Sequence, residues 1–306
     1  MLDIYRKIGK AIYDMKNPRE IRRYYTFLVR AVMHHSELDK LIDFFVEDEA
    51  RKELFYHKPF AAEQVTRSFF YKGSTFAERA KLIKEHFTFF QGKIQSEKFI
   101  DICACDGGRF AIWKSVYEDT PWLAQLGMHN GQRKEGLLSL DMILDTKPHM
   151  KHLYQIIFWV AKNQTGCDAL YIGAMQGPNM DDAKDVIKKL TKHCHGYRTK
   201  NLILYMTQAV ARTLGIEKIY AVTNYGYYAN NHVRVDRKLK TSFSDFWEEA
   251  GGTPTADKRF YELPLIEPRK TMDEVPTRKR AVYRRRFELL DSIDRDIEEN
   301  VRAMMK

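Results

Sequence analysis

Three consecutive segments, two strand-like and one helical, restrict the fold of this chain more than any other feature. Residues 169–175 form an apolar run of strand type. Residues 201–214 carry apolar side chains at helical spacing and end at Gly215, and residues 216–223 follow at once as a second apolar strand. Two strands joined in this way through a helix lie parallel in one sheet. The sequence therefore predicts a sheet with one internal crossover.

Upstream of this unit, short apolar runs separated by turn signals are typical of antiparallel strands. Asp106-Gly107 and Asn130-Gly131 favour tight turns between such runs. A later run, residues 260–264, ends in proline, which predicts a strand at the edge of the sheet. The upstream runs predict a meander of about five strands, over residues 99–105, 110–113, 138–144, 153–160 and 169–175.

The first 95 residues carry helical signals. Asn17-Pro18 matches a helix start, with asparagine as N-cap and proline at the first helical position. Ser36 is expected to open another helix, and Thr75 and Glu78 have the spacing of a capping box. A last helix is expected over residues 278–304.

These patterns predict an α+β fold with an N-terminal helical region and a mixed, mostly antiparallel sheet that contains the strand–helix–strand crossover. We expect three parts. Residues 1–95 form the helical region, residues 96–270 form a mixed α/β domain, and residues 271–306 form a basic helix packed on that domain.

Composition supports a globular protein. Hydrophobic residues make up 44% of the 306 positions and aromatic residues 13%, which is ample material for a core. No window approaches about 18 uninterrupted apolar residues, so no transmembrane segment is expected. The N-terminus has no apolar stretch of signal-peptide type, and four cysteines are too few for a disulfide framework. A reducing, cytoplasmic location is the expectation that follows.

The positive charge of the chain is concentrated near its C-terminus. The net charge is +10, which favours polyanionic partners or simply keeps the protein in solution. A solvated helix, partly paired with the acidic residues that follow it, explains the basic segment without any partner. Docking on anionic lipid headgroups is the functional alternative, and nucleic acid is disfavoured because no recognised binding signature occurs. The candidate residues for an anionic surface are Arg278, Lys279, Arg280, Arg284, Arg285 and Arg286.

The connection between the first parallel strand and the crossover helix is the strongest candidate binding site. Ligands favour the carboxyl ends of parallel strands, and the backbone N–H groups of a helix N-terminus attract anions. Glycines there let a ligand approach the backbone, and cations can hold phosphate, although turns and solvated side chains would explain both without a ligand. The predicted contacts to a phosphate-bearing small molecule are Gln176, Gly177, Gly196, Arg198, Lys200 and Asn201.

Histidine and asparagine side chains near this connection are candidates for catalysis. Histidine can exchange a proton near neutral pH, so His193, His195 or His232 could act as a general base, although each alone is more often structural. Asn224 begins an aromatic and amide-rich segment after the second parallel strand. We name Asn224, His232 and His195 as catalytic candidates. No metal is predicted, because His193, Cys194 and His195 alternate in direction and other ligands are not evident.

Several motifs lie in a recognisable order over most of the chain. They are YIGAMQGP at 171–178, LTKHCHGYRTKNL at 190–202 and AVTN at 221–224, with further matches at 78–87, 246–252, 260–265 and 276–286. Together they resemble the VirK/YbjX family of bacterial proteins, a domain of unknown molecular function. Met175, Cys194 and Thr199 depart from the residues usual in the family.

This resemblance implies a cytoplasmic protein of Gram-negative bacteria, with peripheral contact to the inner membrane as an open alternative. It also implies a link to virulence, envelope properties and tolerance of antimicrobial peptides. The family has no agreed reaction and no agreed catalytic residues.

The order of elements is also similar to that of GCN5-related acetyltransferases, in which acyl-CoA binds between the parallel strands. Their glycine-rich phosphate signature is missing here, and about twenty extra residues precede the crossover helix. The sequence leaves two hypotheses open. One is an acyl-CoA-dependent, acyltransferase-like enzyme, and the other is a non-enzymatic regulator or peripheral membrane factor that acts through the basic helix.

Overall fold

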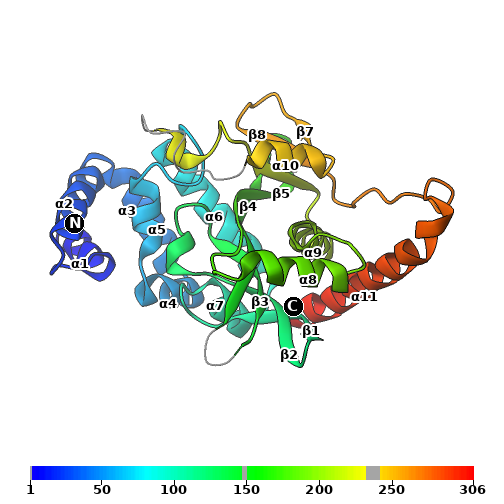
Figure 1. Ribbon diagram of the computed structural model, residues 1–306. Coiled ribbons are helices and arrows are strands. Elements are labelled where there is room, and N and C mark those ends of the chain that lie inside the picture. The colour runs from blue at the N-terminus through cyan, green and yellow to red at the C-terminus, as the bar shows by residue number, and fades with distance from the viewer. Residues whose placement is uncertain (1, 147–149, 232–241) are drawn as a thin grey trace.

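The computed structural model describes residues 2–146, 150–231 and 242–306. Their strands form one mixed sheet in the order β1-β2-β3-β4-β5-β6-β8-β7, as the α+β prediction requires (Figure 1). The strands are β1 (Phe110–Tyr117), β2 (Thr120–Gly127), β3 (Leu138–Leu144), β4 (Lys151–Lys162), β5 (Asp168–Gln176), β6 (Lys218–Val222), β7 (Thr253–Pro254) and β8 (Phe260–Leu263). The helices are α1 (Leu2–Ile12), α2 (Pro18–Met33), α3 (His35–Val46), α4 (Glu49–His57), α5 (Phe60–Thr66), α6 (Phe76–Lys93), α7 (Ser96–Cys103), α8 (Ala183–His193), α9 (Thr199–Thr213), α10 (Phe243–Glu249) and α11 (Arg280–Met304).

The antiparallel meander is present, but one of its strands was assigned wrongly. Residues 99–105 do not form a strand, because α7 covers most of them and buries Phe99, Ile102 and Cys103 at helical spacing. Asp106-Gly107 therefore follows a helix and joins no hairpin. The missing strand is β2, which pairs with β1 through a tight turn at Glu118 and Asp119, both at positive φ.

The crossover is confirmed. β5 and β6 are parallel, with Ala169 opposite Lys218 and Ile172 opposite Ala221, and α9 lies between them in the chain. Gly215 ends the helix at a φ of 73°, a conformation that glycine adopts without strain. The connection before α9 holds a second helix, α8, which the sequence pattern did not reveal.

Residues 260–264 were placed wrongly at the sheet edge. β8 lies between β6 and β7, so the short strand β7 forms the edge instead. Pro264 is compatible with this interior position because β8 ends one residue before it.

The helix starts of the N-terminal region follow the capping signals. The Asn17 side chain accepts a hydrogen bond from the Arg19 N–H, and Thr75 and Glu78 form the complete capping box. The helix expected to open at Ser36 begins one residue earlier, as α3.

The sheet is the middle layer of the molecule (Figure 1). The N-terminal helices lie on one face of it, where Phe70 and Tyr71 of the segment before α6 pack on Trp159 of β4. α9 and α11 cover the other face, and the Tyr205 hydroxyl of α9 donates to the Leu290 carbonyl of α11. Among the described residues, no helix is both long and apolar enough to span a bilayer.

Candidate functional site at the end of the parallel strands

β5 and β6 separate at their carboxyl ends. Their pairing stops at Ile172 and Ala221, but β5 continues for four more residues, to Gln176. β6 instead leads into a turn at Thr223, whose N–H donates to the Arg259 carbonyl. In the part of the chain that the structure describes, no strand pairs with the outer edge of residues 173–176. Gly173 and Ala174 are buried on this edge, whereas Gln176 is exposed, so the edge is open to a ligand at its carboxyl end.

A β-bulge lies where the separation begins. The pairing of β5 with β4 shifts register between Ile172 and Ala174, which makes Gly173 the extra residue. A Cβ atom on Gly173 would stand 1.8 Å from the Glu135 carbonyl oxygen, so only glycine fits there. Because of this extra residue, the pairing of β5 with β4 after the bulge is shifted by one residue relative to the pairing before it.

The segment that covers the bulge is polar. Glu135 is 5% exposed, and its Oε1 accepts a hydrogen bond of 3.1 Å from the Tyr227 hydroxyl. Burial raises the pKa of the Glu135 carboxyl to about 7, although the hydroxyls of Tyr227 and Tyr228 act in the opposite direction. A titratable group is thus buried next to the bulge, where β5 and β6 stop pairing.

The α9 N-terminus carries three of the predicted contacts. The Glu249 carboxylate of α10 lies 3.1 Å from the Lys200 ammonium and 3.6 Å from the Arg198 guanidinium. These contacts, the Lys200 hydrogen bond foremost, lower the pKa of Glu249. The Oδ1 atom of Asn201 is buried and has no hydrogen-bond partner within residues 2–146, 150–231 and 242–306. The structure therefore brings Arg198 and Lys200 together around one anionic group.

The other predicted contacts divide between two openings. Gln176 and Gly177 line a cavity of about 610 Å³ beyond the end of β5. Gly196 lines a separate groove of about 620 Å³ between α8 and α11. His195 also lines this groove at a φ of 51°, and its carbonyl oxygen accepts a 2.9 Å hydrogen bond from Arg286.

Two of the catalytic candidates have a described environment. The Asn224 side chain holds the start of α10, since its Oδ1 accepts from the Phe243 N–H at 2.7 Å and its Nδ2 donates to the Ser242 hydroxyl at 3.0 Å. His195 lies in the groove given above, and His232 lies outside the described residues. These three residues stay predictions.

A row of polar side chains crosses the same end of the sheet, and the sequence analysis named only Gln176 of it. Gln125, Asp141, Gln155 and Gln176 are direct cross-strand partners on four neighbouring strands, so their side chains share one face. His129 Nε2 lies 2.6 Å from the Asp141 carboxylate, which is 1% exposed and also accepts from Gln155. The sequence signal that could have revealed this row is Asp141, an acidic residue inside the apolar run at 138–144.

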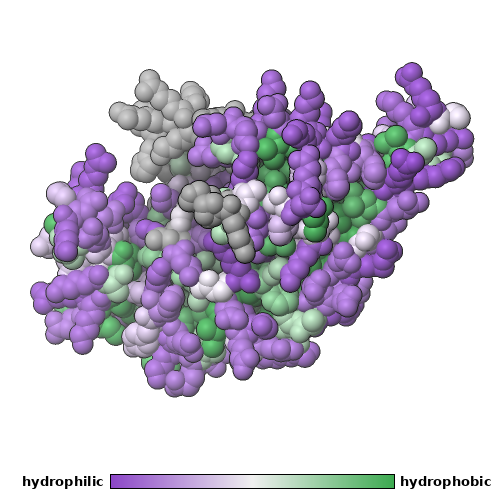
Figure 2. Space-filling view, turned by 60° about the horizontal axis from the view of Figure 1, so that its bottom comes forward, coloured by the Kyte–Doolittle hydropathy of each residue, from purple (hydrophilic) through white to green (hydrophobic). Residues whose placement is uncertain are grey.

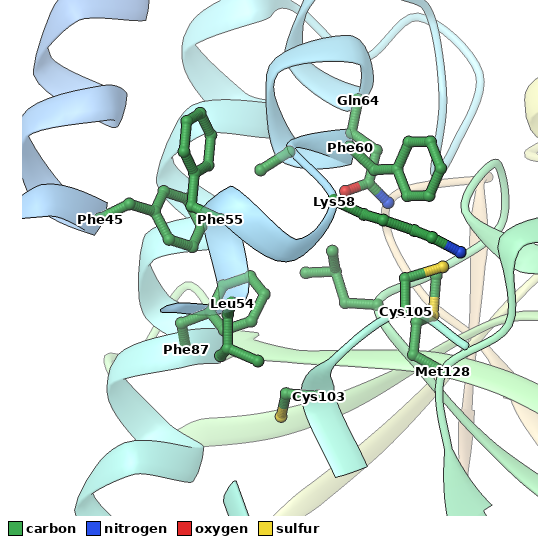
Figure 3. A pocket seen from close by; sticks show the side chains of 12 residues that line it. Phe45, Leu54, Phe55, Lys58, Phe60, Gln64, Phe87, Cys103, Cys105 and Met128 are labelled. Carbon is green, nitrogen blue, oxygen red and sulfur yellow. The ribbon is translucent and has the colours of Figure 1, made fainter. Parts of the chain in front are cut away.

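The apolar pocket shown in Figure 3 has the wrong chemistry for an active site. It measures about 40 Å³, and Lys58 at its mouth is held by Asp106 at 2.7 Å. Burial raises the pKa of the Cys103 thiol, and that of the Cys105 thiol to about 12, so both stay protonated and unreactive.

The basic segment near the C-terminus is sorted by the structure into bound and exposed cations. Arg286 donates to the His195 carbonyl, and Arg280 donates to the Val275 carbonyl and lies 3.7 Å from Asp273. Within α11, Arg302 pairs with Glu298, whereas Asp291 and Asp294 pair with Arg269 and Arg212 from outside this helix. The side chains of this segment that stay exposed are Arg278, Lys279, Arg284 and Arg285.

The sheet order and the crossover define the class: an α+β protein whose mixed sheet has one parallel strand pair and a cavity of about 610 Å³ beside the carboxyl end of β5. The chain belongs to the family described as Protein of unknown function (DUF535), whose model matches residues 16–299. It is 27% identical to the uncharacterized protein YbjX of Escherichia coli (strain K12), over 78% of this chain and 68% of YbjX. The VirK/YbjX resemblance is thereby confirmed.

Other relatives carry little functional information. An uncharacterized protein of Haemophilus influenzae (strain ATCC 51907 / DSM 11121 / KW20 / Rd) is 33% identical over 58% of this chain and 56% of its own length. A Mannheimia haemolytica protein named Membrane protein LapB is 24% identical over 72% of this chain and 88% of its own length. No solved structure matches this chain.

Proposed function

We propose that this protein is an acyl-CoA-dependent, acyltransferase-like enzyme whose cofactor lies between the separated ends of β5 and β6. The observation that carries this proposal is the unpaired edge of β5 over residues 173–176, next to a bulge and a helix N-terminus. An acyl-CoA has an extended arm with two amide groups and ends in a diphosphate. These two parts match a free strand edge and a cationic helix start.

The element order supports the same proposal. β5, α9, β6, α10, β7 and β8 follow one another with β8 inserted between β6 and β7, an order similar to that of acetyltransferases. α8 departs from that similarity because it lengthens the connection before α9. The diphosphate contacts proposed here are therefore side chains and backbone groups of the α9 start, in place of a glycine-rich loop.

Glu249 gives the proposed phosphate site a defined resting state. Its carboxylate pairs with both Arg198 and Lys200 and leaves one net positive charge, and a diphosphate would compete with it for these two cations. Replacing Glu249 by glutamine removes this competing charge, so Glu249→Gln is expected to bind acetyl-CoA more tightly than the wild type does.

Calorimetric titration with acetyl-CoA and with CoA tests the proposal. The double variant Arg198→Ala/Lys200→Ala is expected to weaken acetyl-CoA binding by about tenfold or more, as loss of charge-assisted hydrogen bonds requires. The matched control is Arg19→Ala/Arg22→Ala, which removes the same charge from exposed positions of α2 and should leave binding unchanged. A wild-type protein that gives neither heat nor a thermal shift with acetyl-CoA would contradict the proposal.

A second candidate is a peripheral membrane factor in the cytoplasm. The start of α11 projects from the body of the molecule, and Figures 1 and 2 show this arm as mostly hydrophilic with a small hydrophobic patch. Its exposed cations accompany Val282, which is 43% exposed. A relative named as a membrane protein, together with the virulence and envelope link that the VirK/YbjX resemblance implies, favours this candidate.

Co-sedimentation with vesicles separates the two candidates. Arg284→Ala/Arg285→Ala should reduce binding to vesicles that contain phosphatidylglycerol, and salt should reduce the binding of the wild type. The Arg19→Ala/Arg22→Ala control should bind as the wild type does. If both double variants bind the vesicles equally well, the cations at the start of α11 do not cause membrane binding.

A further inference from the structure

A buried carboxylate orients a histidine at the cavity beyond β5. The Asp141 carboxylate lies 2.6 Å from His129 Nε2 and also accepts from the Gln155 amide. Arg109 Nη2 lies 2.9 Å from the other ring nitrogen, Nδ1. Because an arginine can only donate, Nδ1 accepts and Nε2 carries the proton. The lone pair of Nδ1 therefore points away from the sheet, toward the exposed guanidinium of Arg109.

This arrangement is costly for a purely structural element. Asp141 is 1% exposed within a strand whose every residue is buried, and an unpaired carboxylate there would lose several kcal/mol of hydration. An apolar residue would fill the same position in the sheet without that penalty. The pair fixes one tautomer and one orientation of His129, which is what a proton-transfer group requires.

The cavity lies at the end of the sheet where β5 extends beyond its pairing with β6. His129 and Gln155 line it together with Gln176 and Gly177, where β5 ends. Its volume of about 610 Å³ is that of a small-molecule site. A group bound here would lie next to Gln176 and Gly177, at the carboxyl end of β5.

The charge of the cavity wall indicates the class of ligand. Arg109 and Lys151 are the cationic side chains of the wall, and no aspartate or glutamate belongs to the described lining. Asp141 lies behind His129 and keeps its charge, and Lys151 is paired with Asp182 at the rim. Arg109 is therefore the cation of this wall that has no acidic partner among the described residues, and an anionic group of a ligand fits beside it.

We propose that this cavity binds the acyl acceptor, an anion that carries a nucleophilic hydroxyl, and that His129, positioned by Asp141, takes the proton of that hydroxyl. This inference rests on the proposed acyl-CoA function and adds its acceptor and its general base. The acceptor's anionic group draws Arg109 away from Nδ1, which frees the lone pair for the hydroxyl proton.

The reaction balances without a further reagent. Nδ1 takes the hydroxyl proton while the oxygen attacks the thioester carbonyl, which forms a new C–O bond. The C–S bond then breaks, and the imidazolium gives its proton to the leaving thiolate. The products are an ester and free CoA thiol, and His129 returns to its starting tautomer.

The test measures CoA thiol release from acetyl-CoA with three acceptors: glycerol 3-phosphate, glycerol and water alone. The wild type is expected to release thiol fastest with glycerol 3-phosphate. His129→Gln should lower the rate by about 10²- to 10⁴-fold, the usual contribution of a general base. The dissociation constant of acetyl-CoA, measured by calorimetry, should stay unchanged in this variant.

Two further variants separate chemistry from folding. Arg109→Ala changes an exposed side chain and should remove the preference for glycerol 3-phosphate over glycerol, because the cation that binds the phosphate is lost and Nδ1 is free with either acceptor. Asp141→Asn keeps the shape of the buried group and should lower kcat. Its acetyl-CoA affinity and its melting temperature should stay close to those of the wild type.

The outcomes also distinguish the two levels of the proposal. A wild-type protein that does not bind acetyl-CoA overturns the proposed function and this inference with it. A wild-type protein that binds acetyl-CoA but releases no thiol with any acceptor overturns only the inference. Thiol release by His129→Gln at the wild-type rate does the same.

Discussion

The two ends of β5 differ in their strand pairing and in the side chains that surround them. At its amino end the strand is paired on both sides, and the rings of Trp159, Tyr171 and Tyr220 stack along one face, with an interplanar angle of 4° between the first two. At its carboxyl end only β4 pairs with it, and the same face carries Gln155 and Gln176. One end of a single strand therefore supplies stability, while the other keeps unpaired backbone and polar side chains available.

The largest effect expected from this contrast is at the aromatic end. Trp159→Ala removes a side chain that is 1% exposed and should lower the free energy of unfolding by about 3–5 kcal/mol. Urea unfolding measures this loss. At a temperature where the variant is folded, its affinity for acetyl-CoA should match that of the wild type, and a large loss of affinity would break the contrast between the two ends.

The next effect is a pH dependence at the bulge. Burial raises the pKa of Glu135 from 4.5 to about 7 in the folded state, so folding favours the protonated carboxyl. This contribution to stability is complete below pH 4.5 and is lost as the pH rises to about 7, a change of about 3 kcal/mol. Urea unfolding at pH 5 and pH 8 should show it.

The matched variant for this effect is Glu135→Gln, which cannot titrate. Its unfolding free energy should fall less between pH 5 and pH 8 than that of the wild type. An identical fall in both proteins would show that other groups cause the pH dependence.

A smaller effect is expected at the bulge glycine. Gly173→Ala would bring a Cβ atom to 1.8 Å from the Glu135 carbonyl oxygen, so backbone must move, and a loss of about 1–3 kcal/mol is expected. Gly92→Ala is the control, because no atom lies within 4 Å of the added Cβ and the helix α6 gains propensity. Thermal unfolding should rank Gly92→Ala at or above the wild type and Gly173→Ala below it.

The smallest effect on stability is expected at the exposed polar end. Gln176→Ala should change the unfolding free energy by less than about 0.5 kcal/mol, since the residue is exposed. Calorimetry should nevertheless show weaker acetyl-CoA binding, because this residue ends the unpaired edge of β5 that the proposal assigns to acyl-CoA. If this variant is strongly destabilised, Gln176 contributes to the stability of the sheet, which contradicts the expected contrast.

The sequence predicts the crossover and the helix caps well because both depend on local signals. The helix that ends at Gly215 is long and periodic, and Asn17 and Thr75 cap helices through bonds to residues two or three positions away. Residues 99–105 misled the analysis, because a short apolar run fits a strand and a buried helix equally well.

Only part of the site was predicted, because the remaining side chains meet through the pairing register of neighbouring strands. The cationic start of α9 follows from a loop and a helix, which are visible in sequence. The meeting of His129 with Asp141, and of Asp141 with Gln155, depends on which residues face each other across strands. One residue of slip would separate them, and the sequence alone does not fix that register.

Amide hydrogen exchange with and without saturating acetyl-CoA tests the central claim most directly. If acyl-CoA lies between the separated strands, protection should rise in residues 173–177 and in the first turn of α9, while the stacked aromatic end of β5 stays as it was. Unchanged exchange in those residues, or protection confined to the groove between α8 and α11, would contradict the account.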